Sequence, residues 1–453
     1  MNADAIVVGA GAAGLAAARY LAGRSLRVIL LEARDRTGGR VWSIPSESSS
    51  AAPAELGAEF IHGPARETRA LLRDAGAAAV DLGGESWTRG MNGELRREDD
   101  KFMIAASIFE LAGALPTDET VDRFLRRFEN DSAVQEKAAA ARAFVEGFEA
   151  ADPTIASVRA IADEWRSGVD STTARPVGGY IPMFAQLSHT PAAAGVRRCL
   201  STVVRRIAWR RGEVSVDATN SRGESRKFRA RAAIVTAPAG VLRRGGEDGE
   251  VAFDPELPAT KRAALAKIEM GHVVKVVLRF RTAFWERVRE GRYRDAAFFR
   301  THELPFVAFW TQLPLRSDLI VAWTAGPKTT ALSALSRSER IDLALANFGA
   351  LLGESALARK EFQTGATHDW SGDPFARGAY SYVAVGGGDA RNTLAAPVDD
   401  TLFFAGEATS FDGQGGTVNG ALETGERAAR ELATSLANSY SRCGDRDNGS
   451  SVE

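Results

Sequence analysis

Three glycines near the N-terminus carry the first chemical signal of the chain. Gly9, Gly11 and Gly14 form the pattern GxGxxG, between an apolar run (5–8) and an Ala-rich stretch (12–23). In this pattern the first glycine allows a tight turn, the second lets the backbone approach a pyrophosphate, and the third lets a helix and a strand pack closely. A phosphate would then lie at the helix N-terminus, where free N–H groups favour negative charge.

The next apolar run ends in an acidic residue. Residues 27–32 have the pattern of a second buried strand, and Glu32 ends it, 18 residues after Gly14. A carboxylate at this place can accept hydrogen bonds from ribose hydroxyls and disfavours a 2′-phosphate. The sequence therefore predicts a βαβ unit that binds a dinucleotide, and NAD and FAD both remain open at this step.

A loop rich in glycine and arginine follows the acid. It spans residues 34–41 and reads RDRTGGRV. Such a loop suits a ligand whose phosphates extend back across it, and Arg40 would then neutralise the pyrophosphate.

The composition excludes several classes of protein. The chain has 453 residues, and its 57 Lys+Arg against 58 Asp+Glu give a net charge of -1. This balance argues against a protein that coats nucleic acid or an anionic membrane. Two cysteines and five scattered histidines exclude a disulfide framework and predict no metal site. The 44 glycines exceed the roughly 32 of an average chain of this length, and the excess is clustered.

Neither a membrane span nor a targeting segment is expected. No run of 18 or more apolar residues occurs. The apolar run 5–8 lacks a preceding basic region and is too short for the core of a signal peptide. We therefore expect a cytoplasmic protein with neither nucleic acid nor membrane as a partner.

Periodicity predicts the remaining elements. Residues 64–170 are mostly helical in pattern, and residues 203–217 predict two strands joined by a turn at Arg211-Gly212. Further apolar strands are expected at 232–238, 272–280, 319–325 and 402–407, with helices at 338–352 and 418–437 and a disordered tail at 438–453.

Five segments, taken in order, resemble the flavin-containing amine oxidases. They read VVGAGAAGLAAARYL, LLEARDRTGGRV, ELGAEFIHG, LFFAGEATS and GTVNGALETGERAA, and the resemblance covers residues 1–437. This family includes monoamine oxidases, polyamine oxidases, lysine-specific histone demethylases and L-amino-acid oxidases. The resemblance implies an α/β fold in which a Rossmann-like FAD-binding domain is interleaved with a mixed α+β substrate-binding domain. The FAD-binding domain would comprise 1–70, 195–250 and 375–437, and the substrate-binding domain 71–194 and 251–374.

The resemblance also implies which residues hold FAD. The ADP half would contact Gly9, Gly11, Ala13, Gly14, Glu32, Ala33, Arg34, Gly39 and Arg40, with Val204 at the adenine. Gly57, Ala58, Glu59, Phe60 and Trp370 would lie near the flavin ring, Gly406 and Glu407 near the ribityl or pyrophosphate region, and Thr417 and Val418 at the C2 carbonyl end. Ala379 stands where monoamine oxidases carry the cysteine that links to the flavin, so noncovalent FAD is expected.

Lys275, Tyr380 and Thr417 are the catalytic candidates. Lys275 lies inside the apolar run VVKVVLRF and matches the family lysine that holds a water near flavin N5. Tyr380 resembles the aromatic residue on one side of the flavin face. Thr417 stands where many relatives have the second tyrosine, as in the histone-demethylase branch, which predicts a more open pocket.

The substrate pocket has further candidates. His62 occupies a position that is polar or acidic in polyamine-oxidase relatives, and Glu59 and Glu164 could hold a distal ammonium. Phe411, Trp310 or Phe309 could close the aromatic cage, although a plain core role is the commoner one for each.

The implied reaction is oxidation of a C–N bond in a primary or secondary amine, either a polyamine or a monoamine. A hydride would pass to flavin N5, the imine would hydrolyse, and O2 would be reduced to hydrogen peroxide. The alternatives are an L-amino-acid oxidase, a dehydrogenase or desaturase of the same fold acting on a C–C bond, a histone demethylase, and an FAD-binding scaffold without activity. L-amino-acid oxidases commonly have an arginine in the GA motif that can bind the substrate carboxylate. This chain has Phe60 at that position, which disfavours that alternative.

Overall fold

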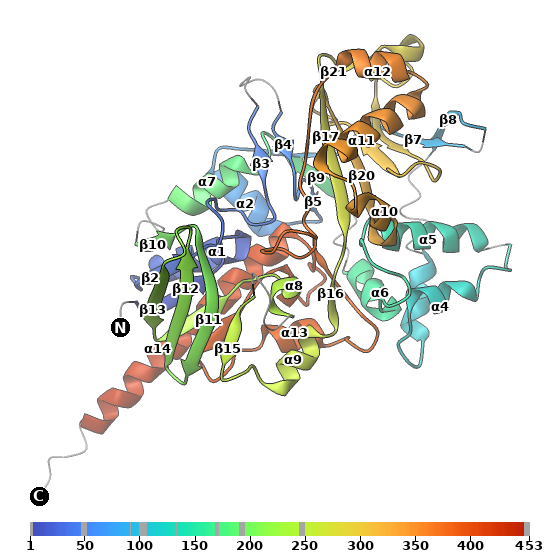
Figure 1. The fold of residues 1–453 in the computed structure, drawn as a ribbon. Helices are drawn as coiled ribbons and strands as arrows, with labels where there is room; N and C mark the ends of the chain where they lie inside the picture. The colour runs from blue at the N-terminus through green and yellow to red at the C-terminus, as the bar shows by residue number, and fades with distance from the viewer. Residues whose placement is uncertain are drawn as a thin grey trace, which may run out of the picture.

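The structure is a computed structural model of the chain. It describes residues 3–46, 52–90, 92–98, 107–132, 134–167, 172–189, 195–243 and 250–447. Figure 1 shows the parallel sheet and the long helix α14 in one half of the molecule, and the strands β17, β20 and β21 in the other half.

A five-stranded parallel sheet forms the centre of the first half. Its order is β10 (Val196–Cys199), β2 (Val28–Leu31), β1 (Ala5–Val8), β14 (Ala232–Val235) and β23 (Leu402–Phe404). Strands β1, β2, β14 and β23 consist of apolar residues that are all buried, as strands covered on both faces require. Together with helix α1 (Ala12–Ala22), they confirm the predicted βαβ unit.

The register brings the ends of these strands together. Ala5 of β1 pairs with Val28 of β2 and with Ala232 of β14. Because the strands are parallel, the residues that follow them, Gly9 and Glu32, emerge at one edge of the sheet. Ligands of such sheets bind at this carboxyl edge.

Helix α14 (Val418–Asp447) packs along α1 and continues beyond it. The predicted helix end near residue 437 is therefore wrong, and the expected disorder of the tail stays a prediction. Once a helix is established, each further residue adds a backbone hydrogen bond, so a polar segment can extend it without packing. Residues 448–453 of the predicted tail lie outside the described residues.

A second sheet contains the predicted hairpin. Strands β13 (Ser225–Ala230), β12 (Glu213–Asn220), β11 (Thr202–Arg210) and β15 (Ala252–Asp254) are neighbours in that order. The turn at Arg211-Gly212 is confirmed, and Gly212 has the positive φ of 74° that such a tight turn needs.

A seven-stranded sheet forms the core of the second half. Its order is β21 (Phe362–Thr367), β17 (Val273–Phe280), β20 (Leu319–Ala325), β19 (Ala308–Trp310), β18 (Ala296–Arg300), β7 (Glu85–Arg89) and β8 (Leu95–Glu98). Val274, Val276 and Leu278 of β17 pack in the core with helix α11 (Arg337–Leu352). Side chains alternate along a strand, so Lys275 lies on the opposite face.

The predicted helical stretch 64–170 is only partly correct. It contains α2 (Arg66–Asp74), the 3-10 helix η1 (Glu110–Ala114), α4 (Val121–Arg126), α5 (Gln135–Gly147) and α6 (Val158–Arg166). Between them, however, lie β6 (Ala79–Asp81) and the antiparallel pair β7–β8. Gly93, with φ of 80°, turns the chain between β7 and β8, and the Asn-Gly pair that contains it is a hairpin signal.

The other elements complete the two halves. The small sheets pair β3 (Ser43–Ile44) with β4 (Ala54–Glu55), β5 (Ile61–His62) and β6 with β9 (Thr173–Pro176), and β16 (Ile268–Met270) with β22 (Ser381–Val383). The further helices are α7 (Ile181–His189), α8 (Ala239–Leu242), α9 (Ala259–Leu265), α10 (Thr330–Ser333), α12 (Ser355–Glu361) and α13 (Ala390–Ala395), and the short 3-10 turns are η4 (Phe284–Glu286), η5 (Val288–Gly291), η6 (Gly326–Thr329) and η7 (Glu407–Thr409).

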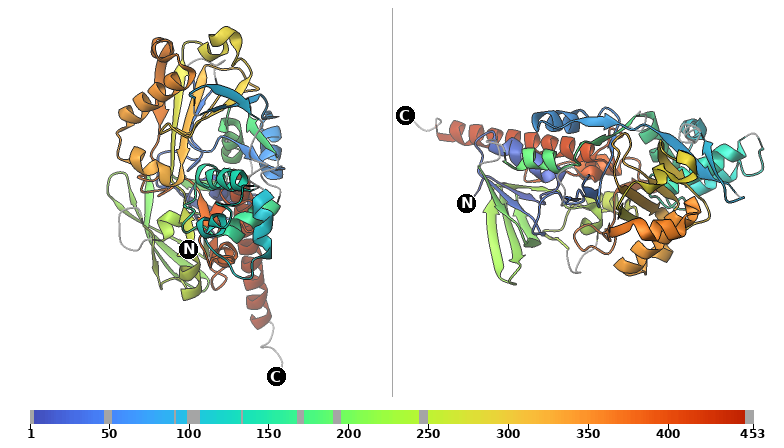
Figure 2. Two further views of the ribbon diagram at one scale, coloured as in Figure 1. Left: turned by 90° about the vertical axis from the view of Figure 1, so that its right-hand side faces the viewer. Right: turned by 90° about the horizontal axis from the view of Figure 1, so that it is seen from above.

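Two helices pack across the predicted domain boundaries. Met183 and Leu187 of α7 lie in the core around α1, and Leu265 of α9 lies in the core with β14 and β23. Both helices fall in ranges expected for the substrate-binding domain, so the boundaries stay a prediction. Figure 2 shows the two halves side by side, with α14 directed away from the seven-stranded sheet.

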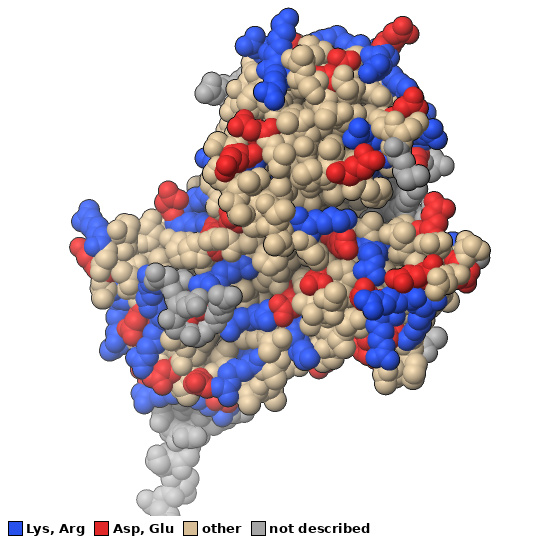
Figure 3. Space-filling model, turned by 45° about the vertical axis from the view of Figure 1, so that its right-hand side comes forward, with Lys and Arg blue, Asp and Glu red and all other residues tan. Residues whose placement is uncertain are grey.

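The surface carries charge of both signs. On the face drawn in Figure 3, Lys and Arg are interspersed with Asp and Glu. Among the described residues, no helix combines the length and apolar character needed to cross a membrane.

Candidate functional site

A cavity of about 1130 Å³ joins the carboxyl edge of the parallel sheet to the seven-stranded sheet. Almost every residue proposed from the sequence lines it: Gly9, Gly11, Ala13, Glu32, Ala33, Arg34, Gly39, Arg40, Gly57, Ala58, Glu59, Phe60, His62, Val204, Lys275, Trp370, Tyr380, Gly406, Glu407, Thr417 and Val418. Gly14, Phe309 and Phe411 are absent from the lining, and each has a physical reason.

The glycine loop fits a pyrophosphate. Gly9 has φ of 103°, which favours glycine. A Cβ on Gly14 would lie 1.8 Å from the carbonyl oxygen of Gly9, so Gly14 serves helix–strand packing and not ligand contact. Gly11 is the N-cap of α1, and a Cβ there would meet nothing closer than the Gly38 oxygen at 4.0 Å. The backbone at Gly11 therefore opens onto the cavity at a helix N-terminus, where an anion is favoured.

Glu32 is held by the backbone around it. Its carboxylate accepts hydrogen bonds from the N–H groups of Ala10 (2.7 Å) and Arg34 (2.9 Å). Burial raises the pKa of Glu32, and the two backbone hydrogen bonds oppose that rise. The carboxylate is thus oriented at the strand end, where a ribose hydroxyl could reach it.

Arg34 is fixed by an aspartate from a distant segment. Its guanidinium donates two hydrogen bonds to Asp373, at 2.7 and 3.0 Å, and Nε2 of His368 lies 2.6 Å from the same carboxylate. Burial raises the pKa of Asp373, but the hydrogen bonds from His368 and Arg34 outweigh it and keep that pKa below its usual range. Asp373 thereby fixes the Arg34 side chain at the cavity.

Arg40 and Glu407 form a second buried ion pair. Arg40 Nη1 lies 2.7 Å from Glu407 Oε1 and also donates to the carbonyl of Ala379 at 3.0 Å. The other Glu407 oxygen accepts from the hydroxyl of Ser381 (2.6 Å) and from the N–H of Gly416 (3.2 Å). Burial raises the pKa of Glu407, but the charges of Arg40 and Arg391 outweigh it and lower that pKa.

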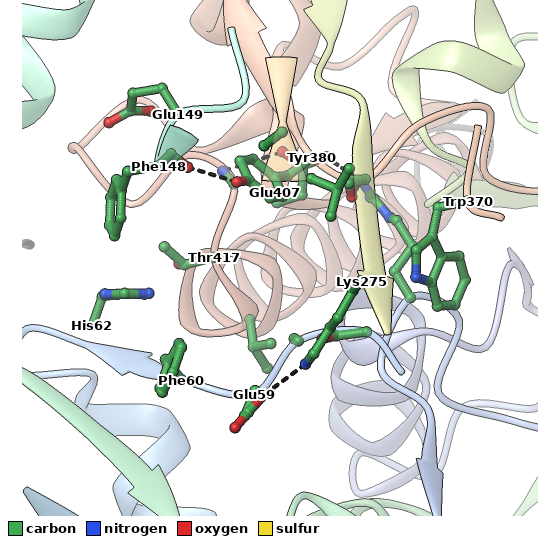
Figure 4. A pocket seen from close by; sticks show the side chains of 18 of the residues that line it. Glu59, Phe60, His62, Phe148, Glu149, Lys275, Trp370, Tyr380, Glu407 and Thr417 are labelled. Atoms are coloured by element: carbon green, nitrogen blue, oxygen red, sulfur yellow. Dashed lines mark hydrogen bonds and ion pairs between the residues drawn. The ribbon is translucent and has the colours of Figure 1, made fainter. Parts of the chain in front are cut away.

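Lys275 is buried and paired with a carboxylate. Its side chain is 3% exposed. Its Nζ donates to Glu59 Oε2 at 2.7 Å and to the Gly57 carbonyl at 3.1 Å. Figure 4 shows Lys275 pointing from β17 toward Glu59. The sequence interpretation treated Lys275 as desolvated and did not foresee this partner.

Glu59 has four polar neighbours, which leaves little of its carboxylate for a substrate ammonium. Oε1 accepts from Trp310 Nε1 at 3.0 Å and from Gln312 Nε2 at 3.1 Å, and Arg175 lies at 3.4 Å. Burial raises the pKa of Glu59, but the charges of Lys275 and Arg175 outweigh it and lower that pKa. Arg175 and Gln312 were not proposed from the sequence. Neither residue belongs to a motif, so the sequence did not point to them. Only the structure shows that Arg175 is buried in the short strand TARP.

Tyr380 and His62 both line the cavity, and Phe148 contacts each of them (Figure 4). The Tyr380 hydroxyl donates to the carbonyl of Phe148 at 2.6 Å, and the ring of Phe148 packs edge-on against His62 with centroids 5.2 Å apart. Burial raises the pKa of Tyr380, so its hydroxyl stays protonated. Phe148 is a wall residue that the sequence interpretation missed, since nothing in its helical segment distinguishes it from a core residue.

His62 is the polar group of this wall. Its Nδ1 is buried without a hydrogen-bond partner. Burial lowers the pKa of His62 to about 4, so the imidazole is neutral at pH 7. A neutral imidazole has one nitrogen free to accept a hydrogen bond. His62 therefore offers an acceptor to a ligand amine.

Thr417 is a helix cap. Its hydroxyl accepts from the N–H of Gly420 at 2.9 Å and donates to the Gln414 carbonyl at 2.9 Å. Since α14 starts at Val418, this is the N-cap arrangement. The hydroxyl of Thr417 is thus engaged in the fold, although the residue lines the cavity.

The three residues proposed to close the aromatic cage, Phe411, Phe309 and Trp310, lie in different surroundings. Phe411 is 57% exposed and is absent from the cavity lining, so its predicted pocket role is wrong; the loop after η7 turns it outward. Phe309 is fully buried in the core of the seven-stranded sheet. Trp310, its neighbour in β19, points to the other face and lines the cavity. Trp370 also lines it and donates to the Leu56 carbonyl at 2.9 Å.

Acidic side chains outnumber basic ones in the rest of the lining. The acids are Asp81, Glu85, Glu98, Glu136, Glu146, Glu149 and Glu164, and the bases are Arg97, Arg300 and Lys328. Burial raises the pKa of Glu164, while Arg391, 3.3 Å away, opposes that rise. This excess of carboxylates favours a cationic ligand.

Known proteins match the chain over nearly its full length. Polyamine oxidase 4 of Oryza sativa subsp. japonica is 29% identical over 469 residues, which cover 94% of this chain and 88% of that protein. Lysine-specific histone demethylase 2 of Homo sapiens is 27% identical over 472 residues, and the chain spans only 53% of its length. A putrescine oxidase structure with bound putrescine superposes with a TM-score of 0.78 at 22% identity, covering 96% of this chain and 99% of that one.

A family model agrees with these relatives. The model described as flavin containing amine oxidoreductase matches residues 12–86 and 89–433. The likeness to solved structures confirms the predicted α/β fold with its Rossmann-like unit. The chain therefore belongs to the flavin-containing amine oxidoreductase family.

Proposed function

We propose that the chain is an FAD-dependent oxidase of primary or secondary amines. The observation that carries this is the single cavity that joins the loop at Gly11 to Lys275, Tyr380 and His62. A long dinucleotide in that cavity would have its ADP end at the glycine loop and its ring near Lys275 and Tyr380. Ala379 offers no thiol for a covalent link, so we propose that FAD is bound noncovalently.

The residues from Gly9 to Arg40 and around Glu407 would hold FAD, which would supply two-electron oxidation of the carbon next to the amine nitrogen, with O2 as the final acceptor and hydrogen peroxide as its product. The chain itself would bind and orient the amine. Phe60, Tyr380 and Phe148 would form apolar walls that exclude water, and His62 would accept a hydrogen bond from the amine N–H. Hydrolysis of the imine would then release a carbonyl compound.

The charge of the cavity supports a substrate with a second cationic group. Ten carboxylates line it against six Lys and Arg side chains. A diamine or polyamine could place its reacting nitrogen near His62 and a distal ammonium near these acids. We therefore propose polyamines before simple monoamines.

One observation supports an L-amino-acid oxidase as a second candidate. Arg300 lines the cavity, and its Nη1 donates to the Ser86 hydroxyl at 3.2 Å. A guanidinium in this place could bind a substrate carboxylate.

Flavin bleaching distinguishes these functions. The purified holoenzyme is mixed without oxygen with spermine, spermidine, putrescine, benzylamine and a set of L-amino acids, and peroxide is measured after air is admitted. We expect amines to bleach the flavin, polyamines fastest. Bleaching by amino acids alone would establish the second candidate, and no bleaching would favour C–C chemistry or a scaffold. Acid precipitation should release the flavin into the supernatant; flavin retained in the pellet would contradict noncovalent binding.

A further inference from the structure

We propose that Glu59 is the positioning residue of Lys275: it holds the lysine as an ammonium at one point of the cavity wall. The effect of Glu59 on turnover rests on the proposed function. The contact between Glu59 and Lys275 does not depend on it. The family resemblance assigned Glu59 only to the flavin neighbourhood or to a distal ammonium.

The pair joins the two halves of the molecule. Lys275 comes from the seven-stranded sheet, and Glu59 follows the short strand β4 in the segment Gly57-Ala58-Glu59. Gly57 allows this segment to pass close to the loop 34–41, since a Cβ there would lie 1.8 Å from the Arg40 oxygen. The Gly57 carbonyl and the Glu59 carboxylate therefore both reach the Lys275 Nζ, at 3.1 and 2.7 Å.

Glu59 is itself held rigidly. The indole of Trp310 and the amide of Gln312 donate to its other oxygen. Trp310 ends β19, and Gln312 lies two residues further along the chain. Arg175 of β9 adds a positive charge at 3.4 Å and donates to the side chain of Gln312. A side chain with two hydrogen-bond donors and a nearby guanidinium at one oxygen has little freedom, so its second oxygen presents a fixed acceptor to Lys275.

Burial makes the carboxylate necessary. Glu59 and Lys275 have side chains that are 4% and 3% exposed. An ammonium without a counter-charge at this depth would tend to lose its proton, whereas a carboxylate in contact favours the charged form. Removing one partner of a buried pair leaves the other charge uncompensated. Glu59 therefore supplies the counter-charge of the buried Lys275 at a contact of 2.7 Å.

A double-mutant cycle tests the pair in the FAD-free protein. Thermal unfolding is compared for the wild type, Glu59→Gln, Lys275→Met and the double variant. We expect each single variant to lower Tm by several degrees and the double variant to lose less than the sum, because it leaves neither Lys275 without its carboxylate nor Glu59 without its ammonium. Arg175 loses its contact with Glu59 both in Glu59→Gln and in the double variant, so this loss cancels in the cycle. Additive losses would show that the two side chains are not coupled and would overturn the proposal.

The pH profile of reoxidation tests the positioning role. The holoenzyme is reduced with dithionite, so that no amine is needed, and mixed with O2 between pH 6 and 9. We expect a nearly flat rate for the wild type, and for Glu59→Gln a rate that falls about tenfold toward pH 9, because the buried Lys275 then has no carboxylate in contact. Glu59→Asp should restore most of the flat profile, and Lys275→Met should be slow throughout.

Glu119→Gln is the matched control. Glu119 is a buried carboxylate that pairs with Arg123 at 3.3 Å and does not line the cavity, so its variant should keep the wild-type profile. A Glu59→Gln profile identical to that of the wild type would overturn the proposal. If no amine bleaches the flavin, the proposed function fails, yet the unfolding cycle and the dithionite experiment still decide the role of Glu59.

Discussion

His62 shows how one side chain's environment sets its chemistry. The sequence offered it only as a polar residue in an aromatic segment. In the structure it lies between Phe60 and Phe148, with ring centroids at 6.3 and 5.2 Å. This apolar contact explains the lowered pKa and makes His62 an acceptor for a neutral amine.

Replacing His62 should weaken amine recognition. His62→Ala removes the acceptor, and we expect kcat/KM for the best amine to fall about tenfold, which corresponds to one lost hydrogen bond. His62→Gln keeps an acceptor and should lose less. Because the pKa of His62 is about 4, the ratio of wild type to His62→Ala should be constant from pH 6 to pH 8. A ratio that changes around pH 6.5 would contradict the neutral acceptor.

At the scale of elements, Thr417 caps the start of α14. The Thr417 hydroxyl bonds the third residue of the helix, Gly420. We expect Thr417→Ala to reduce the free energy of unfolding by about 1 kcal/mol, and Thr417→Ser to have almost no effect, as measured by urea denaturation. Unchanged stability together with lost amine binding would instead assign the hydroxyl to the substrate.

The contact between α14 and α1 needs a glycine. A Cβ on Gly425 would lie 2.2 Å from the carbonyl oxygen of Ala13. Gly425→Ala should therefore separate the helices and cost about 1–3 kcal/mol, seen as a lower Tm and weaker FAD retention. Gly147 ends helix α5, and a Cβ added there would meet no atom within 4 Å. Gly147→Ala should therefore not lower Tm. An equal response of both variants would contradict close helix packing.

The stability of the whole molecule should depend on a buried acid. Glu55 accepts from the Ser43 hydroxyl at 2.7 Å and from the N–H of Tyr180 at 3.1 Å, which ties together three distant segments. Burial raises the pKa of Glu55 from 4.5 to about 7. Between these values the folded protein binds more protons than the unfolded chain, so stability falls as the pH rises from 4.5 through 7.

Glu55→Gln should remove this dependence. We expect the variant to resemble the wild type at pH 5 and to exceed it by about 3 kcal/mol at pH 8, because a shift of one pKa unit corresponds to about 1.4 kcal/mol. Unfolding by guanidinium chloride at both pH values measures the difference. Parallel behaviour of the two proteins would show that Glu55 is already ionised in the folded state.

Local patterns predicted much of the fold. The strand Ala5–Val8 and the helix that follows it agree with expectation because spacing and apolar runs act over a few residues. Strands β6 to β8 were missed because a polar edge hairpin has little apolar alternation. The end of α14 was missed because its last turns extend a helix already formed.

The sequence by itself determined the glycine loop, the acid Glu32 and the lysine inside an apolar strand, since each is a feature of neighbouring residues. Only the tertiary structure decided what those residues contact. Lys275 and Glu59 are 216 residues apart along the chain, and their meeting depends on how the seven-stranded sheet packs against the GAEF segment. The same packing placed Phe411 outside the cavity and made Phe148 part of its wall. Which side chains face the cavity depends on how elements far apart in the sequence pack against each other. A local sequence pattern does not contain that information.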